Sequence, residues 1–206
     1  MRVSGVFLAG DSSLYAIDKC GWLSGARRLA TPNCSPRPPG EAVSLLVIHS
    51  ISLPPGSYGG GYIERFFCNA LEAGEHPYFA TIAQLQVSAH FLIARSGELT
   101  QFVSCLERAW HAGKSRFGGR ENCNDFSIGI ELEGTDTDAY TDHQYRALAA
   151  VTRALMAAFP QLGAGSIVGH SDIAPQRKTD PGAGFDWHRY RASLAQTVTE
   201  KHKSGL

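Results

Sequence analysis

The sequence has no excess of charge of either sign and no long apolar run. Its 206 residues carry 19 basic and 19 acidic side chains, so the formal net charge is zero. This balance gives no electrostatic reason to expect a nucleic acid or an anionic membrane as partner. No apolar run approaches the roughly 20 residues that span a bilayer, and the apolar patch at the N-terminus is shorter than the roughly 7–15 residues of a signal peptide core. We therefore expect a cytoplasmic protein.

The sequence also lacks closely spaced cysteines. Its five cysteines are scattered and odd in number: Cys20, Cys34, Cys68, Cys105 and Cys123. No two of them stand in CxxC spacing, and no histidine near Cys123 could pair with it as a catalytic base. Scattered thiols of this kind are typical of reduced, partly buried cysteines in a cytosolic protein.

Patterns of strands and helices alternate along the chain, which predicts an α/β protein. The continuous apolar run 44–49 predicts a strand that is buried on both faces. In 127–133, Ile128, Ile130 and Leu132 alternate with Gly129, Glu131 and Glu133, so the two sets face opposite sides of a strand. We further expect a short helical turn within 21–29, a helix over 61–73, a hairpin over 91–103 that turns at Ser96-Gly97, a helix from the capping box Thr141-x-x-Gln144 to Phe159, a strand over 166–168 and a last helix capped by Asp186.

The composition indicates one domain with an N-terminal appendage. A hydrophobic fraction of 43% is sufficient for a sizeable core. Residues 1–20 lack strong periodicity, and we interpret them as an N-terminal extension, either a poorly ordered tail or the product of an upstream start site. Residues 21–206 are expected to form the domain.

Two distant segments hold residue types that bind zinc. His49 ends the first apolar strand, and the Gly/Pro-bounded segment 169–182 holds His170, Lys178 and Asp180. Two imidazoles and one carboxylate would form a three-ligand zinc site with an open fourth position, where a hydrolase holds the attacking water. A histidine at a strand end is more often structural, and spacing alone does not show that His49 meets the downstream loop.

Several longer runs carry a resemblance to a known family. They are Gly21-Trp22-Leu23, Leu46-Val47-Ile48-His49, 51–56, His76-Pro77-Tyr78-Phe79, 87–90, Trp110-His111-Ala112-Gly113, 123–135 and 170–182. On these runs the chain, from about residue 21 to about 191, resembles the AmpD-type zinc N-acetylmuramoyl-L-alanine amidases of the amidase_2 superfamily, whose fold is shared with peptidoglycan-recognition proteins. The resemblance implies a mixed central β-sheet flanked by helices, with zinc at the floor of a groove.

The resemblance also implies roles for five residues. One Zn²⁺ per chain would be bound by His49, His170 and Asp180, while Glu131 and Lys178 would serve the chemistry. Glu131 lies on the strand face opposite Ile128 and is a candidate general base. An ammonium group at Lys178 would stabilise a developing oxyanion. For both residues, the plainer alternative is a solvated side chain.

The resemblance implies six substrate contacts, and some of these positions depart from the residues usual in the family. The six are Ser50, Tyr78, Gln86, Trp110, Asn122 and Ala174. Ser50 stands where relatives often have Asn, and Gln86 and Asn122 stand where close relatives often carry arginines that are thought to contact the stem peptide. Because Gln and Asn cannot form the paired charged hydrogen bonds of Arg, we expect weaker discrimination between diaminopimelate and lysine peptides. His90 and His111 could line the groove or pack.

The implied function is hydrolysis of the amide bond between (1,6-anhydro-)N-acetylmuramic acid and the L-alanine of the stem peptide, in cytoplasmic recycling of peptidoglycan. The expected partner is an anhydro-muropeptide, with no nucleic acid, membrane or obligatory protein partner. By the same resemblance, the activity would lower the fragments that induce β-lactamase in some bacteria. Two alternatives stay open. A non-catalytic peptidoglycan-binding receptor is disfavoured because all candidate ligands are present, and an endolysin-type amidase of the intact wall is disfavoured by the expected absence of a signal peptide and a wall-binding domain.

Overall fold

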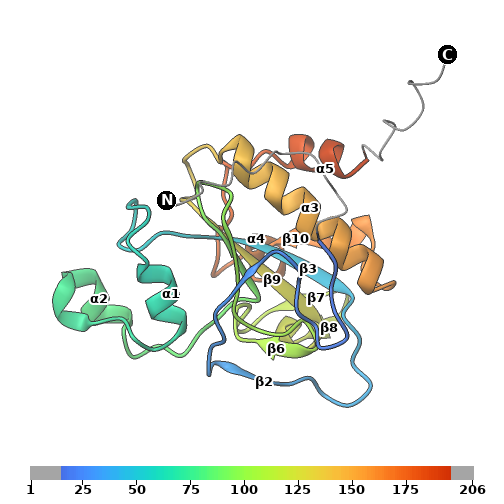
Figure 1. The fold of residues 1–206 in the computed structure, drawn as a ribbon, viewed down its shortest axis with the longest axis horizontal. Coiled ribbons are helices and arrows are strands. Elements are labelled where there is room, and N and C mark those ends of the chain that lie inside the picture. The colour runs from blue at the N-terminus through green and yellow to red at the C-terminus, as the bar shows by residue number, and fades with distance from the viewer. Residues whose placement is uncertain (1–14, 196–206) are drawn as a thin grey trace, which may run out of the picture.

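A six-stranded mixed sheet organises the computed structural model, which describes residues 15–195 (Figure 1). The strand order is β1-β5-β4-β9-β3-β10. Strands β4, β9, β3 and β10 run parallel to one another, β5 is antiparallel to β4, and β1 is parallel to β5. The bounds are β1 Arg27–Arg28, β3 Leu45–Ile51, β4 Phe91–Ile93, β5 Leu99–Gln101, β9 Ser127–Glu133 and β10 Ile167–Gly169. Two small antiparallel sheets accompany it: β2 (Cys34–Pro36) with β6 (Glu107–Ala109), and β7 (Arg116–Phe117) with β8 (Arg120–Glu121).

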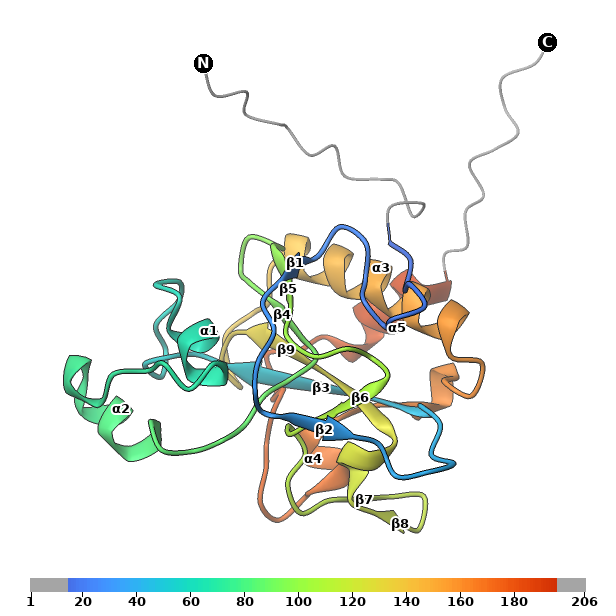
Figure 2. The ribbon, with the colours of Figure 1, turned by 60° about the horizontal axis from the view of Figure 1, so that its bottom comes forward.

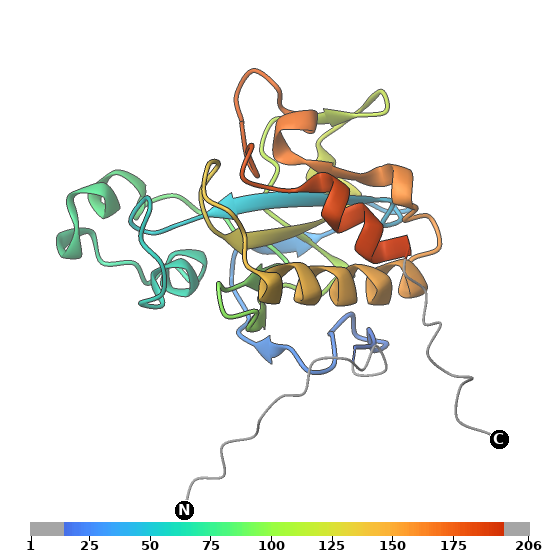
Figure 3. The same cartoon turned by 90° about the horizontal axis from the view of Figure 1, so that it is seen from above.

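Helices cover both faces of this sheet. Their bounds are α1 Tyr62–Phe67, α2 Pro77–Ile82, α3 Asp142–Ala158, α4 His170–Ile173 and α5 Trp187–Ala195, with 3-10 turns at Ala73–Glu75, Cys123–Asp125 and Ala164–Ser166. Helices α3 and α5 lie side by side on one face (Figure 3), and α4 packs on the other. Helices α1 and α2 project from one end of the sheet (Figures 1 and 2). The predicted fold class, a mixed central sheet flanked by helices, is confirmed.

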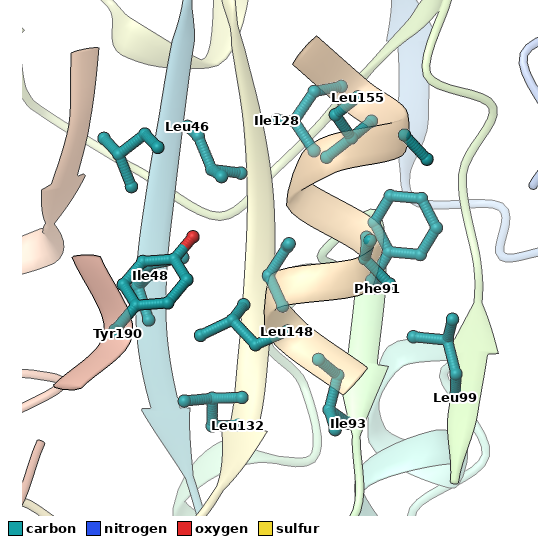
Figure 4. Close-up of a cluster of buried hydrophobic side chains, with 14 of the residues drawn as sticks. Leu46, Ile48, Phe91, Ile93, Leu99, Ile128, Leu132, Leu148, Leu155 and Tyr190 are labelled. Carbon is teal, nitrogen blue, oxygen red and sulfur yellow. The ribbon is translucent and has the colours of Figure 1, made fainter. Parts of the chain in front are cut away.

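The main core lies between the sheet and α3 with α5. Leu46 and Ile48 of β3 face these helices, while the alternate residues Leu45 and Val47 face α4, and all four are fully buried. The continuous apolar run therefore reflects a strand that is covered on both sides. Figure 4 shows Leu148 and Leu155 of α3 and Tyr190 of α5 packed against side chains of β3, β9 and β4.

The predicted start of the long helix is confirmed, and its cap also fixes the helix to the sheet. The Thr141 hydroxyl accepts a hydrogen bond from the backbone N–H of Gln144 at 3.1 Å, and the Gln144 side chain accepts one from the Thr141 N–H at 3.0 Å. The Gln144 amide group then donates to the carbonyl of Glu133, at the end of β9, at 2.8 Å. The final helix is capped as predicted, since Asp186 accepts from the Arg189 N–H at 2.8 Å.

The expected helical turn within 21–29 is wrong. Ile17 instead forms an antiparallel bridge with Leu23, and residues 27 and 28 form β1 at the edge of the sheet. The Leu23 N–H donates to the buried side chain of Gln101 at 2.7 Å, so tertiary hydrogen bonding replaces the helical pattern. Of the predicted extension, residues 1–14 lie outside the described part, while Ile17 packs against the main core.

The helix expected over 61–73 is also much shorter than the apolar spacing predicted. It comprises only Tyr62–Phe67. Asn69 adopts the left-handed conformation with φ of 57°, which no helix can continue through. Of the apolar residues whose helical spacing suggested this helix, Ile63, Phe66 and Phe67 are buried in it, whereas Ala70 lies beyond its end and is exposed. Within residues 15–195, no helix has the length and apolarity needed to span a membrane.

We predict that Leu148→Ala lowers the free energy of unfolding by about 2–5 kcal/mol, because it leaves a cavity in a fully buried position. Leu85→Ala, the same substitution at a side chain that is 50% exposed, is the matched control and should change stability by no more than about 0.5 kcal/mol. Urea denaturation of both variants measures the difference. Equal losses would contradict the assignment of the core.

Candidate metal centre

The parallel pairing of β9, β3 and β10 brings residues that are distant in sequence together near the carboxyl ends of these strands. In the register of β3 with β9, His49 lies opposite Glu131. In the register of β10 with β3, Gly169 lies opposite Ile48, so the next residue, His170, reaches the level of His49. The carboxyl ends of parallel strands are where open α/β sheets place their ligand sites.

His49, His170 and Asp180 converge at this edge. The Nδ1 atoms of the two histidines are 2.9 Å apart, and each lies 3.1 Å from Oδ2 of Asp180. Both histidines are almost fully buried, with 1% and 3% of their surface exposed. The structure thus gathers the three candidate ligands, and together they can hold a metal ion.

The donor set and its spacing fit zinc. Four-coordinate zinc binds nitrogen and oxygen at about 2.0–2.1 Å, which places neighbouring ligand atoms about 3.3 Å apart in a tetrahedron. The three observed distances, 2.9 to 3.1 Å, require only a slight spreading to reach that value. Two imidazoles and one carboxylate form a set that leaves a fourth position for water or substrate.

The protonation states at this site also suit a metal. Burial lowers the pKa of His49 to about 4, against the opposing hydrogen bond with Asp180, so the imidazole is neutral at pH 7. Burial alone would raise the pKa of Asp180, but hydrogen bonds from His170 and His49 outweigh it and hold that pKa far below its usual range. Neutral imidazoles and an ionised carboxylate are the forms that bind metals.

One short loop contacts the far side of both histidines. The Nε2 atom of His170 faces the carbonyl oxygen of Ala112 at 3.1 Å, and Nε2 of His49 faces Nδ1 of His111 at 2.9 Å. The side-chain oxygen of Asn124 accepts from the backbone N–H groups of His111 and Ala112, at 3.1 and 2.8 Å, and so holds the loop in place. Arg177 also donates to the Ala112 carbonyl, at 2.6 Å.

Glu131 lies beside His49, across the pairing of β3 with β9. Within the described residues, its Oε2 atom is buried and has no hydrogen-bond partner. Burial, followed by the charge of Asp180, raises the pKa of Glu131 well above its usual range, and Lys178 acts in the opposite sense. A carboxyl group with a raised pKa accepts a proton more readily than an ordinary glutamate, as a general base must. Its neighbour Glu133 has a structural role instead, because it accepts from the backbone N–H groups of Gly59 and Arg95.

Lys178 lies exposed in the loop between α4 and Asp180. Its backbone N–H donates to the carbonyl of Ala174 at 3.0 Å. Its charge acts on His49 and on Glu131, lowering the pKa of both. The ammonium group is therefore within electrostatic reach of the candidate ligand His49 and of Glu131.

The six predicted substrate contacts do not gather at one place as the three candidate ligands do. Ser50 donates to Asp136 at 3.3 Å, and the Trp110 indole donates to Ser35 at 3.1 Å. Ala174 is buried one turn after His170, whereas the side chains of Tyr78, Gln86 and Asn122 are exposed. In the part of the chain that the structure describes, no side-chain hydrogen bond joins any of the six to the three candidate ligands.

No sequence pattern pointed to the residues that support the Asp180 loop. Asp136, in the loop after β9, accepts hydrogen bonds from Ser50 and from Thr179, the residue before Asp180. A Cβ atom on Gly182, where φ is +76°, would lie 2.2 Å from the backbone of Asp136, so only glycine allows the two loops to approach this closely. The contacts of Asp136 with Thr179 and Gly182 do not follow from spacing, because they join two loops rather than regular elements.

Comparison with known proteins assigns this geometry to a family. The family described as N-acetylmuramoyl-L-alanine amidase matches residues 39–183. The chain is 57% identical over 179 residues to the curated 1,6-anhydro-N-acetylmuramyl-L-alanine amidase AmpD of Escherichia coli K12, covering 87% of this chain and 97% of that protein.

Solved structures agree with the sequence comparison. A crystal structure of a selenomethionine derivative of AmpD matches with a TM-score of 0.83 at 57% identity, covering 85% of this chain and 98% of that one. The amidase AmiD of E. coli, in complex with the substrate anhydro-N-acetylmuramic acid-L-Ala-D-γ-Glu-L-Lys, matches with a TM-score of 0.55 at 28% identity, covering 88% of this chain and 66% of that one.

We predict that zinc raises the unfolding temperature of the metal-free protein and that His49→Ala abolishes this effect. A ligand that binds only the folded state at 100 times its Kd stabilises it by about 2.7 kcal/mol. His188→Ala, which removes an exposed histidine from α5, is the control and should respond to zinc like the wild type. Thermal unfolding with and without zinc measures the shift, and an undiminished shift in His49→Ala would rule this residue out as a ligand.

Proposed function

Because the chain belongs to the N-acetylmuramoyl-L-alanine amidase family, we propose that it hydrolyses the amide bond between 1,6-anhydro-N-acetylmuramic acid and the L-alanine of the stem peptide. The observation that carries the proposal is the convergence of His49, His170 and Asp180 beside Glu131, whose buried Oε2 has no hydrogen-bond partner among the described residues. The substrate class is supported by AmpD of E. coli, which the chain matches over nearly its whole length. The reaction would serve recycling of peptidoglycan fragments in the cytoplasm.

The cofactor in this proposal is one zinc ion per chain, held by His49 Nδ1, His170 Nδ1 and Asp180 Oδ2. Zinc at this position supplies a Lewis acid that activates water and polarises a carbonyl oxygen. The neutral state of His49 and the ionised state of Asp180 support this ligand set, since neither residue would have to change its charge at neutral pH to bind a metal.

Glu131 is the proposed general base. Its Oε2 takes a proton from water as the oxygen of that water forms a bond to the amide carbon. The same carboxyl group then gives the proton to the departing nitrogen as the C–N bond breaks. The products are the free lactyl carboxylate of the sugar and a peptide with a free amino terminus. The raised pKa of Glu131 supports both halves of this transfer, because the group can hold the proton between them.

Lys178 is proposed to stabilise the negative charge that develops on the carbonyl oxygen. An ammonium group fixed near such an oxygen typically contributes roughly 3 kcal/mol to lowering the barrier. The loop position between α4 and Asp180 supports this role, because the same segment delivers a candidate ligand on each side of Lys178.

Substrate binding is proposed to involve Ser50, Tyr78, Gln86, Trp110, Asn122 and Ala174. The exposure of Gln86 and Asn122 is compatible with contact to a peptide. The AmiD of E. coli was solved with a peptide that ends in L-Lys. Reduced discrimination between lysine and diaminopimelate peptides stays a prediction for this chain.

We predict that the purified protein releases the intact stem peptide from anhydro-muropeptide, that a chelator stops the release and that added zinc restores it. Mass spectrometry of the products identifies the cleaved bond, since hydrolysis adds the mass of one water across the two fragments. Whole sacculi, tested in parallel, should be cut far more slowly. Binding of the fragment without cleavage would instead support a receptor, and rapid digestion of sacculi would support an endolysin-type enzyme.

We predict that Glu131→Gln lowers kcat by about 10²–10⁴-fold while zinc content is unchanged, because the amide keeps the shape of the side chain but cannot accept the proton. Glu133→Gln is the matched control two residues along β9. Glu133→Gln should lower the stability of the protein, because Glu133 accepts backbone hydrogen bonds. The folded fraction of this variant should keep a kcat close to that of the wild type. A kcat near that of the wild type in Glu131→Gln would assign the base to another residue.

A further inference from the structure

We propose that His111 is a positioning residue that holds His49 in the orientation and tautomer needed to bind the metal, and that Gly129 and Ser127 of β9 form the cradle for its ring. The inference deepens the proposed function and rests on zinc being bound by His49. His111 lies 62 residues from His49 in sequence, and its ring meets that of His49 edge to face, with centroids 5.0 Å apart.

A continuous line of hydrogen-bonding atoms leads away from the metal-binding face of His49. Nε2 of His49 lies 2.9 Å from Nδ1 of His111, and Nε2 of His111 lies 3.1 Å from the hydroxyl oxygen of Ser127. Each ring nitrogen of His111 therefore has one polar partner. Both nitrogens are thereby satisfied, as a largely buried imidazole requires, and one of the two partners is the candidate metal ligand His49.

The order of the protons along this line follows from the metal. A neutral imidazole that presents the Nδ1 lone pair to a metal carries its proton on Nε2. His49 then donates to Nδ1 of His111, so His111 carries its own proton on Nε2 and donates it to Ser127. Carbonyl, carboxylate and similar acceptors behind a ligating histidine fix the tautomer and the ring plane in this way. For His170, the carbonyl of Ala112 fills the same place.

Gly129 makes room for this arrangement. It lies in the middle of β9, in register with Val47, and its φ is not in the left-handed region. A Cβ atom at this position would lie 2.4 Å from Cγ of His111 and 2.6 Å from its Nδ1. The absence of a side chain is thus required by the close approach of the ring and not by the backbone conformation.

The backbone on either side is fixed as well. The Asn124 side chain holds the N–H group of His111, and the Gly129 N–H donates to Nδ1 of His90 at 3.0 Å. His111 is consequently fixed at its backbone, at both ring nitrogens and across its face. A small displacement of the ring would be transmitted directly to the plane of His49.

The test is zinc affinity, measured by competition with a chromogenic chelator, because His111 is partly exposed and activity alone would not separate positioning from contact with substrate. We expect His111→Leu to weaken zinc binding by about 10–100-fold, as replacement of such supporting partners typically does. His111→Asn should recover most of the affinity, since its amide oxygen can accept from Nε2 of His49. Gly129→Ala should weaken binding by displacing the ring.

His76→Leu is the control, because it also removes a hydrogen bond accepted at Nδ1, here from the Tyr78 N–H at 3.1 Å, but at the start of α2, which projects from one end of the sheet (Figure 2). It should bind zinc like the wild type. Wild-type affinity in folded His111→Leu, or equal weakening in His111→Asn and His111→Leu, would overturn the inference. If His111→Leu does not fold, the zinc affinity of Ser127→Ala is the test instead. An affinity equal to that of the wild type in Ser127→Ala would also overturn the inference. Absence of zinc binding in the wild type would instead refute the proposed cofactor.

Discussion

The site depends on the parallel pairing of β3 with both β9 and β10. This register sets His49 beside Glu131 and, one residue beyond β10, beside His170. A shift of one residue in either pairing would turn one of these side chains to the opposite face of the sheet, into the core under α3. The apolar residues that alternate with them, such as Ile48 and Ile130, are buried and thereby specify the position of the candidate metal-binding and catalytic side chains.

Burial of polar groups is the cost of this arrangement. Two histidines and a carboxylate are withdrawn from water within about one hydrogen-bond length of one another, and Glu131 keeps a buried oxygen without a partner. Such a group costs about 1–3 kcal/mol unless it is satisfied. The surrounding structure supplies partners for ring nitrogens of His49 and His170, while Oε2 of Glu131, the atom proposed to accept a proton, has none among the described residues. This distribution is what a preorganised catalytic site requires.

The regular elements of the fold were predictable from sequence, whereas the contacts between loops were not. The alternation of apolar residues identified β9 and showed that Glu131 lies on the strand face opposite Ile128. The capping box identified the start of α3. The helical spacing after residue 61 predicted too long a helix. The left-handed backbone conformation of Asn69 prevents its continuation, and apolar periodicity carries no information about that conformation. His49 and His170 could be named as candidates, but their meeting depends on strand register. The roles of Asn124 and Asp136 arise from loop contacts over short distances, for which no sequence pattern exists.

The separation of the two histidines in the chain has a consequence for the biogenesis of the protein. His49 and His170 are 121 residues apart, and Asp180 lies further downstream still. During synthesis on a ribosome, the first candidate ligand therefore emerges long before the other two. Strand β3 cannot pair with β10 on its outer side until most of the chain has been made. Pairings at such separation are slow to form. The candidate metal site is accordingly one of the last parts of the molecule to assemble, and a nascent chain that lacks His170 and Asp180 has only one of the three candidate ligands.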